Sequence, residues 1–330
     1  MATEKRNYFY FITLLRALAA IVITNSHYVG IYPTDMIANG GLLGDVMFFS
    51  VSGFCLSNPK IAFKIWYPKR LWRIYSVVWV ITLIYAFTTE AYKVGSLTEY
   101  LSVFVYPTKY HFIASIVLLY IPLYFVAKYI KLNLRNYLRL SLGLLTLQVI
   151  IYCTVYDTSY YHIDAVREPM IEFLFFQAML LGLYFRWRCK NSLIEKNLKI
   201  GTTIWLSALL FCVLGVYILS KFFFVKNATY SDFQIINQIV LYFCLFLLFH
   251  LISSRESFIE KLAGTWLWKI VSFLSDHTLE IYLVQSVLIA FVLKMNCSFP
   301  FNWILTTTFI LIAAAALRFV SQKIVRLIKI

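Results

Sequence analysis

Charged residues are scarce in this sequence. Asp, Glu, Lys and Arg make up only 14% of its 330 residues, whereas an ordinary soluble domain carries about a quarter. Acidic residues are the scarcer kind, since 15 of them stand against 30 basic ones and leave a formal net charge of +15. This low charge content argues against a water-soluble globular protein.

Cysteine provides no framework for metal or disulfide chemistry. The six cysteines show neither CxxC nor CxxH spacing, and most lie in or beside apolar runs, so we interpret them as small packing residues. The sequence also lacks GxGxxG, Walker and GxSxG motifs, which are local signatures of dinucleotide, P-loop and serine hydrolase chemistry. We expect no metal site and no separate soluble domain.

Apolar residues are abundant instead, at 61% of the chain. They recur in blocks of about twenty, the length with which a helix crosses about 30 Å of hydrocarbon. The sequence therefore predicts an all-α fold: a polytopic helical membrane bundle of about ten transmembrane helices, in one domain over residues 1–330. The first block is expected to persist as a span, because it is too long for a cleaved signal peptide. The predicted spans are residues 8–30, 40–57, 70–89, 111–130, 137–156, 169–186, 200–220, 233–252, 270–293 and 301–321.

The basic residues follow the expected sidedness of a membrane protein. With the N-terminus in the cytoplasm, 23 of the 30 fall in inner segments, six in outer segments, and Arg16 inside the first span. The positive-inside rule then predicts that both termini are cytoplasmic. The same distribution argues against nucleic acid as a partner, because the charge is not gathered on one soluble module.

Two ionisable residues, Arg16 and His27, interrupt the first apolar block. At 100° and 1.5 Å per residue, their eleven-residue separation places them on one helix face about 16.5 Å apart. In the predicted topology Arg16 lies in the inner half of the span and His27 near its outer end. Ionisable residues in spans often mark functional paths. Snorkelling of Arg16 and interfacial placement of His27 explain them equally well.

Two further stretches are unusual. The segment GGLLGDVMFFSVSGFCLS, residues 40–57, is rich in small residues, which permit close contact between helices. The segment FKIWYPKRLWRIY carries Arg70 and Arg73 three residues apart, so their side chains point the same way on a helix. A guanidinium fork binds phosphate bidentately, although a positive-inside anchor also explains this composition.

In this order, these stretches resemble the membrane-bound acyltransferase 3 family. The resemblance is carried by Arg16 and His27 with ten residues between them, by FFSVSGF at 48–54, and by the RxxR of Arg70 and Arg73. It continues in HFIASIVLLYIPLYF from His111 and in HTLEIYLVQ at 277–285. Three positions depart from the family pattern: the acidic residue Asp45 comes one position early, Ser76 replaces a proline, and Gln285 replaces a late histidine.

The resemblance implies an O-acyltransferase of the bacterial cytoplasmic (inner) membrane. Such an enzyme moves an acyl group, most often acetyl from cytoplasmic acetyl-CoA, onto a hydroxyl of an extracytoplasmic or lipid-linked glycan such as O-antigen, capsule or exopolysaccharide. Arg70 and Arg73 are then expected to hold the phosphates of the acyl-CoA cosubstrate. His27 is expected to be the catalytic base or acyl carrier, with Arg16 beside the donor route. Further candidates for the site are His111, Ser52 and Asp45.

Two questions stay open at the level of sequence. A polytopic transporter or flippase for a glycan or lipid-linked sugar would also use buried Arg and His residues, but it would not account for the RxxR beside the SGF segment. A polar outer loop could contact sugar hydroxyls or be an ordinary solvated loop. This loop contains His162, Asp164, Arg167 and Glu168.

Overall fold

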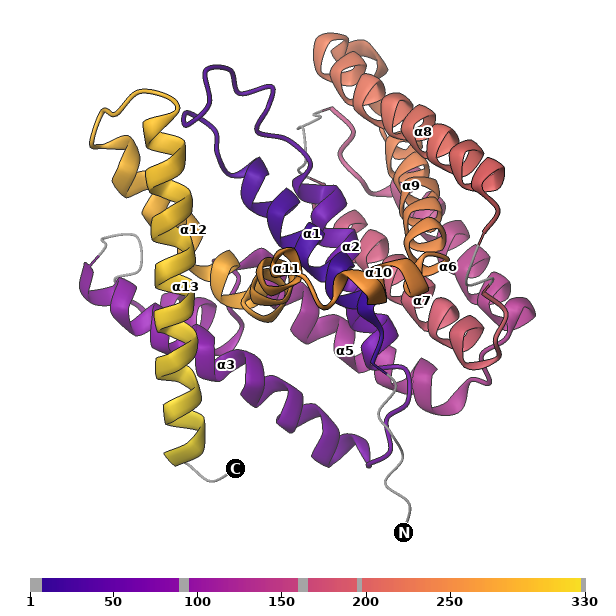
Figure 1. Cartoon of the computed structure of the whole chain (residues 1–330), viewed down its shortest axis with the longest axis horizontal. Helices are drawn as coiled ribbons and strands as arrows, with labels where there is room; N and C mark the ends of the chain where they lie inside the picture. The colour runs from indigo at the N-terminus through magenta and orange to yellow at the C-terminus, as the bar shows by residue number, and fades with distance from the viewer. Residues whose placement is uncertain (1–7, 89–94, 160–165, 195–197, 328–330) are drawn as a thin grey trace. The chain divides into compact units, whose positions relative to one another are not determined.

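The computed structural model describes residues 8–88, 95–159, 166–194 and 198–327 (Figure 1). These residues form helices and connecting loops, with no strand among them, so the predicted all-α class is confirmed. The longer helices are α1 (Tyr10–Ser26), α2 (Gly41–Cys55), α3 (Phe63–Thr88), α5 (His111–Tyr129), α6 (Leu134–Thr154), α7 (Met170–Lys190), α8 (Ile200–Lys226), α9 (Ile235–Ser253), α11 (Trp266–Asp276), α12 (Thr278–Leu293) and α13 (Phe301–Leu327). The shorter elements are α4 (Leu97–Tyr100), the π-helical η2 (Leu101–Val105), the 3-10 helix η3 (Ala228–Phe233) and α10 (Glu256–Leu262).

Seven helices in the described part of the chain are long and apolar enough to cross a membrane, namely α3, α5, α6, α7, α8, α9 and α13. An eighth crossing is formed if α11 and α12, which are bent by 76° at their break, count as one span. The apolar helices α1 and α2 are shorter, with 17 and 15 residues. Each of the ten predicted blocks therefore contains a helix, whereas ten complete crossings stay a prediction.

Two helix ends differ from the predicted spans in a way that affects the candidate site. Helix α3 begins at Phe63, seven residues before the predicted start of its span. Helix α1 ends at Ser26, four residues before the predicted end. Hydropathy marks where a helix enters hydrocarbon, but a helix continues into water wherever its backbone bonds and packing allow it. A span read from hydropathy and a helix therefore need not share their ends.

The chain divides into two compact units, each assembled from separate segments. The first unit comprises Met1–Ala19, Val46–Phe54 and Asn133–Asp276, and the second comprises Ala20–Asp45, Cys55–Leu132 and His277–Ile330. Helices α1 and α2 contribute residues to both. The single domain expected from the sequence stays a prediction.

The first unit is built around pairs of long apolar helices. Helix α8 packs along α9, and α6 packs along α7 (Figure 1). A carboxylate fixes the beginning of α1, because the two oxygens of Glu256 accept hydrogen bonds from the backbone N–H groups of Tyr10 and Phe11, each at 2.8 Å. These donors have no partner within the helix, and a negative charge at a helix N-terminus is stabilising.

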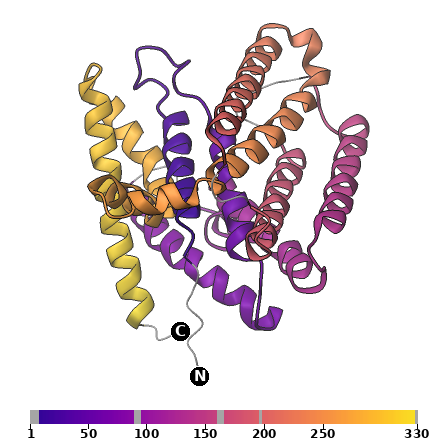
Figure 2. The same cartoon turned by 45° about the vertical axis from the view of Figure 1, so that its right-hand side comes forward.

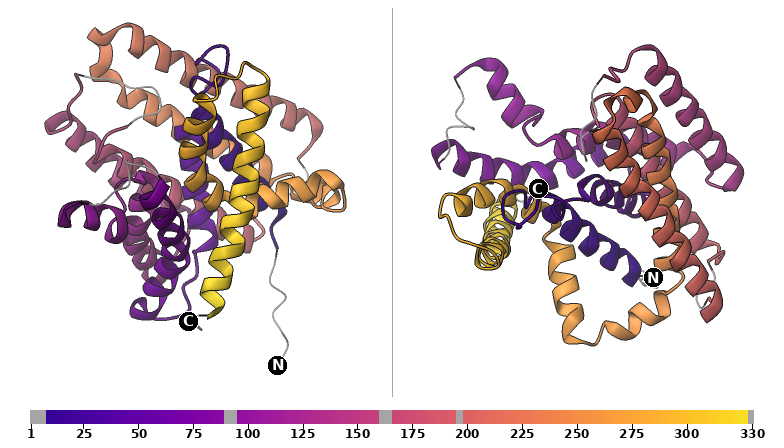
Figure 3. Two further views of the ribbon diagram at one scale, coloured as in Figure 1. Left: turned by 90° about the vertical axis from the view of Figure 1, so that its left-hand side faces the viewer. Right: turned by 90° about the horizontal axis from the view of Figure 1, so that it is seen from above.

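The second unit contains α3, α5, α12 and α13. Helices α12 and α13 lie side by side, in orange and yellow (Figure 2; Figure 3, left). Helices α3 and α5 run antiparallel, since the hydroxyl of Tyr67 donates to the carbonyl oxygen of Val117 at 3.0 Å, while Thr82, further along α3, contacts the hydroxyl of Tyr110 just before α5. Helix α3 also packs against α13.

Candidate active site

Arg16 lies within α1 and is partly buried in the first unit, whereas His27 belongs to the second unit. His27 is the first residue after α1, and its backbone N–H donates to the carbonyl oxygen of Thr24 at 3.1 Å. The sequence prediction placed both side chains on one helix face. Helix α1 ends one residue before His27, so the continuous helix that this prediction assumed stops short of the histidine, and the shared face of the two side chains stays a prediction.

The loop that follows His27 is held by side chains of the second unit. Asn25 donates to the carbonyl oxygens of Ile37 and Asn39 at 2.8 and 3.0 Å. It also accepts a hydrogen bond from the hydroxyl of Tyr32 at 2.8 Å. Asn25, in the last turn of α1, thereby ties the middle and the far end of the loop to the helix and restrains the backbone around His27.

Helix α13 also contacts this loop. The amide of Asn302 donates to the carbonyl oxygen of Ile31 at 2.8 Å, and the hydroxyl of the buried Tyr28 lies 2.9 Å from Thr307 Oγ1. Sequence reasoning missed these residues and Asn25. The sequence feature that could have indicated a role for Asn302 and Thr307 is their polar character inside an apolar block.

The side chain of His27 is exposed. An imidazole can accept a proton near neutral pH. An exposed imidazole on this hydrogen-bonded loop is chemically suited to act as a general base.

The two arginines of the RxxR motif lie inside α3 and not at its first residue. Since α3 begins at Phe63, a rise of 1.5 Å per residue places Arg70 and Arg73 about 10 and 15 Å along the helix. The predicted common direction of their side chains is consistent with unbroken helix between them. The guanidinium of Arg70 lies 5.7 Å from the ring centroid of Trp66, one turn earlier, whereas Arg73 is exposed.

His111 is the first residue of α5 and is exposed. The contacts of Tyr67 with Val117 and of Thr82 with Tyr110 bracket the stretch of α3 that carries the arginines. His111 follows Tyr110 and therefore lies near the Thr82 part of α3, within the same unit as Arg70 and Arg73 but further along the helix. The sequence had assigned it only to the outer end of a span.

The glycine-rich segment forms α2, where the predicted close packing is confirmed at Gly53. A Cβ atom at Gly53 would lie 2.1 Å from the carbonyl oxygen of Met179 in α7. Phe49 stacks on Phe175 of the same helix with ring centroids 4.1 Å apart. Helices α2 and α7 thus approach backbone to backbone.

Asp45 and Ser52, the two polar candidates on α2, are less exposed to solvent than His27. Asp45 and Ser52 are both partly buried, and Asp45 is engaged in interactions within the protein. They belong to different units, with Asp45 in the second and Ser52 in the first.

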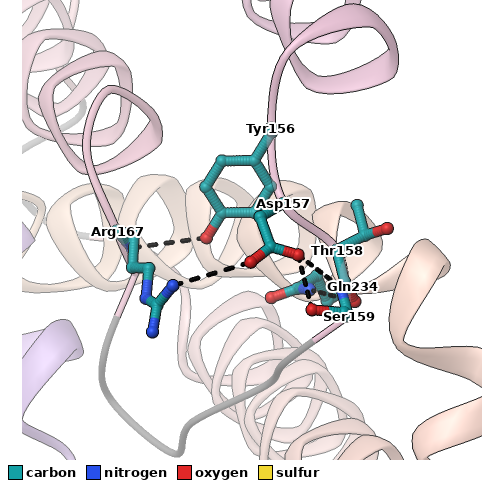
Figure 4. Close-up of polar contacts among 6 residues, drawn as sticks. All are labelled: Tyr156, Asp157, Thr158, Ser159, Arg167 and Gln234. Atoms are coloured by element: carbon teal, nitrogen blue, oxygen red, sulfur yellow. Dashed lines mark hydrogen bonds and ion pairs between the residues drawn. The ribbon is translucent and has the colours of Figure 1, made fainter.

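The polar outer loop is internally hydrogen-bonded where it is described (Figure 4). Arg167 lies 3.7 Å from a carboxylate oxygen of Asp157, and its backbone N–H donates to the hydroxyl of Tyr156 at 3.3 Å. Hydrogen bonds from Ser159, together with the charge of Arg167, lower the pKa of the Asp157 carboxyl. These contacts favour the interpretation of a solvated loop. His162 and Asp164 lie outside the described residues.

Among the described residues, no group of three or more His, Cys, Asp or Glu side chains is arranged to hold a metal ion. Comparison with known proteins gives one finding. A family model described as an acyltransferase domain matches residues 9–321, nearly the whole chain. No curated protein and no solved structure gives a significant match.

Proposed function

The chain belongs to the acyltransferase 3 family, and from this premise we propose that it is an O-acyltransferase that uses acetyl-CoA. The acceptor is a hydroxyl of an extracytoplasmic or lipid-linked glycan such as O-antigen, capsule or exopolysaccharide. The observation that carries the proposal is the family match over residues 9–321. It is supported by an all-helical membrane architecture and by an exposed histidine that follows α1 at the start of a hydrogen-bonded loop.

The proposed location is the bacterial inner membrane, with both termini in the cytoplasm. This orientation rests on the 23-to-6 distribution of basic residues between inner and outer segments and on the positive-inside rule. All ten apolar blocks, including the short α1 and α2 and the bent pair of α11 and α12, are proposed to lie at membrane depth. Short apolar helices at that depth are tolerated where protein surrounds them.

The donor is proposed to enter from the cytoplasm, with its phosphates held by Arg70 and Arg73. The two guanidinium groups share one helix direction, and the stacking of Arg70 on Trp66 limits its conformational freedom. Pre-orientation of this kind reduces the entropy lost on binding. A long, thin pantetheine arm would then carry the thioester towards the interior, with Arg16 along its route.

His27 is proposed to remove the proton from the acceptor hydroxyl as the hydroxyl oxygen attacks the thioester carbonyl. The new ester bond forms as the carbon–sulfur bond breaks, and the CoA thiolate leaves with the electron pair. The proton held by His27 passes to the thiolate or to water. In the alternative route, an imidazole nitrogen of His27 attacks the thioester carbon as the carbon–sulfur bond breaks and the CoA thiolate leaves. The acceptor hydroxyl then attacks the acyl-imidazole, the carbon–nitrogen bond breaks, and the hydroxyl proton passes to the released imidazole. His111, Ser52 and Asp45 are proposed as secondary contacts of donor or acceptor.

A direct assay tests this function. Purified protein in vesicles is incubated with acetyl-labelled acetyl-CoA and candidate glycans, and the expected result is label on the glycan with one CoA released per acetyl transferred. His27→Gln protein serves as the matched control. Movement of unmodified glycan across the vesicle wall, without release of CoA for any acceptor, would instead support a transporter or flippase.

The sidedness has its own test. Single cysteines at Lys64 and Asp35, in a variant with the six natural cysteines replaced, are labelled from either face with a membrane-impermeant reagent. Labelling of position 64 from inside and of position 35 from outside is expected. The reverse pattern would invert the proposed donor and acceptor sides.

A further inference from the structure

Arg186, near the end of α7, occupies an aromatic corner in the first unit. Its guanidinium carbon lies 4.6 Å from the ring centroid of Phe9 and 5.1 Å from that of Phe54. The two rings stand nearly perpendicular, with an interplanar angle of 80° and centroids 5.2 Å apart. The side chain is partly buried, so a positive charge is held in a defined place and is partly shielded from solvent.

The corner is built by the contact between α2 and α7. A Cβ atom at Gly182, one turn before Arg186, would lie 1.8 Å from the carbonyl oxygen of Ser50 and 2.7 Å from the backbone nitrogen of Phe54. This approach of the two backbones brings Phe54 next to Arg186. The ring of Phe54 also packs on that of Phe11, with centroids 5.4 Å apart. Neighbouring rings therefore immobilise the surface on which the guanidinium lies.

The charge of Arg186 is not neutralised by the part of the chain that the structure describes. No ion pair or hydrogen bond of its guanidinium occurs there, and its contacts are with the two rings. Ring faces attract a cation but accept no hydrogen bond in the plane of its N–H groups. A guanidinium that rests on aromatic faces still offers its planar N–H fork, which matches the oxygens of a phosphate.

Arg188, on the same turn of α7, differs from Arg186 because its guanidinium makes a hydrogen bond within the protein. Its guanidinium also lies over rings, 5.8 Å from that of Tyr184 and 5.4 Å from that of Phe185. In addition, it donates a hydrogen bond to the carbonyl oxygen of Leu193 at 3.2 Å. This hydrogen bond engages Arg188 at the end of α7.

We infer that Arg186 is a phosphate-binding residue, held ready by Phe9 and Phe54. Its ligand is a phosphate group either of the acyl donor's nucleotide or of an anionic phospholipid headgroup. Assignment to the donor rests on the proposed function. Assignment to a lipid does not depend on it.

The test measures binding to the purified full-length protein in nanodiscs. Calorimetry gives the Kd of CoA and of inorganic pyrophosphate in phosphatidylcholine nanodiscs, and native mass spectrometry counts bound phosphatidylglycerol in mixed nanodiscs. Arg186→Gln removes the charge at similar length, Arg186→Lys keeps the charge without the fork, and Arg188→Gln is the matched control. Should Arg186→Gln fail to fold, the Lys variant still separates fork from charge.

If the ligand is the donor, Arg186→Gln raises the Kd of CoA and pyrophosphate by about ten- to a hundredfold, the effect expected for one charge-assisted contact. Arg186→Lys has a smaller effect and Arg188→Gln none. If the ligand is a lipid, the CoA affinity is unchanged and bound phosphatidylglycerol is lost. The inference would be overturned if Arg186→Gln lowered the Tm but left the Kd of CoA, the Kd of pyrophosphate and the number of bound phosphatidylglycerol molecules unchanged. Arg186 would then have only a structural role. Failure of the wild-type protein to bind CoA would refute the proposed function, while the lipid measurement would still test Arg186.

Discussion

Gly182 faces Ser50 so closely that a Cβ atom at position 182 would lie 1.8 Å from the carbonyl oxygen of Ser50. The two helices that meet here, α7 and α2, leave no room for any side chain at this point. A contact of this kind relies on van der Waals packing of backbones, which is a main source of helix association in membranes. It also fixes Phe54, and through it the surroundings of Arg186.

Gly182→Ala is therefore expected to destabilise the protein by about 1–3 kcal/mol or more, because the helices must separate to admit a methyl group. Thermal unfolding in detergent, followed by the loss of monodisperse protein, measures the effect. Gly143→Ala is the control, since a Cβ at this helical position meets nothing within 4 Å. That change should stabilise by up to about 1 kcal/mol through helix propensity. Equal Tm values for the two variants would contradict the contact.

His27→Gln is expected to lower the rate of acyl transfer by about a hundred- to ten-thousandfold, the usual contribution of general acid–base catalysis. Expression and Tm should change little, because the side chain is exposed on a loop. Arg16→Lys and Arg16→Ala extend the series: equal losses indicate a need for the planar fork, and a milder Lys variant indicates a need for charge alone. Near-normal transfer by well-expressed His27→Gln protein would remove the catalytic role.

The pH dependence of the wild-type enzyme provides a second measure of His27. A base must be neutral, so kcat/KM should rise with pH through the pKa of His27 in the free enzyme. Histidine changes its charge between about pH 5 and 8, so the acidic limb is expected in this range. Residual activity of His27→Gln should lack this limb. An identical limb in the variant would assign it to another group.

Arg70→Gln and Arg73→Gln are each expected to weaken donor use by about 1.5–3 kcal/mol, the value of one hydrogen bond to a charged group. The effect should fall on the KM for acetyl-CoA, with the KM for the glycan unchanged. Trp66→Leu should raise the same KM to a smaller degree, because it removes the ring on which Arg70 rests. Lys69→Gln, an exposed neighbour on α3, serves as the control. An unchanged acetyl-CoA dependence in the double arginine variant would remove this site.

Gln285 is 1% exposed within α12, and neither atom of its side-chain amide has a hydrogen-bond partner among the described residues. An unsatisfied buried polar group costs about 1–3 kcal/mol, so Gln285→Met should leave the Tm unchanged or raise it. The control is Gln148→Met, because Gln148 bonds to Gln238 at 2.8 Å and to Tyr242 at 3.1 Å. That variant should lower the Tm. A clear loss of stability in Gln285→Met would show that its amide has a partner.

Several properties followed from the sequence because they depend on neighbouring residues. Runs of about twenty apolar residues favour helices at membrane depth, and each such block contains a helix in the structure. The ordered motifs of Arg16, His27, the SGF segment and the RxxR pair indicated the family that the comparison then matched. Close packing at Gly53 followed from the small residues around it. These features need no knowledge of distant segments.

Other properties were decided by the tertiary structure. Hydropathy did not predict that α1 ends before His27, because that turn is held by Asn25 and by residues of α13 nearly three hundred positions away. The corner around Arg186 brings Phe9 and Phe54 next to α7. The periodicity of apolar residues along the chain does not predict which helices pack against each other. The reason is physical: local hydrophobicity sets where helices form, whereas contacts between helices depend on the complementary shapes of residues far apart in sequence.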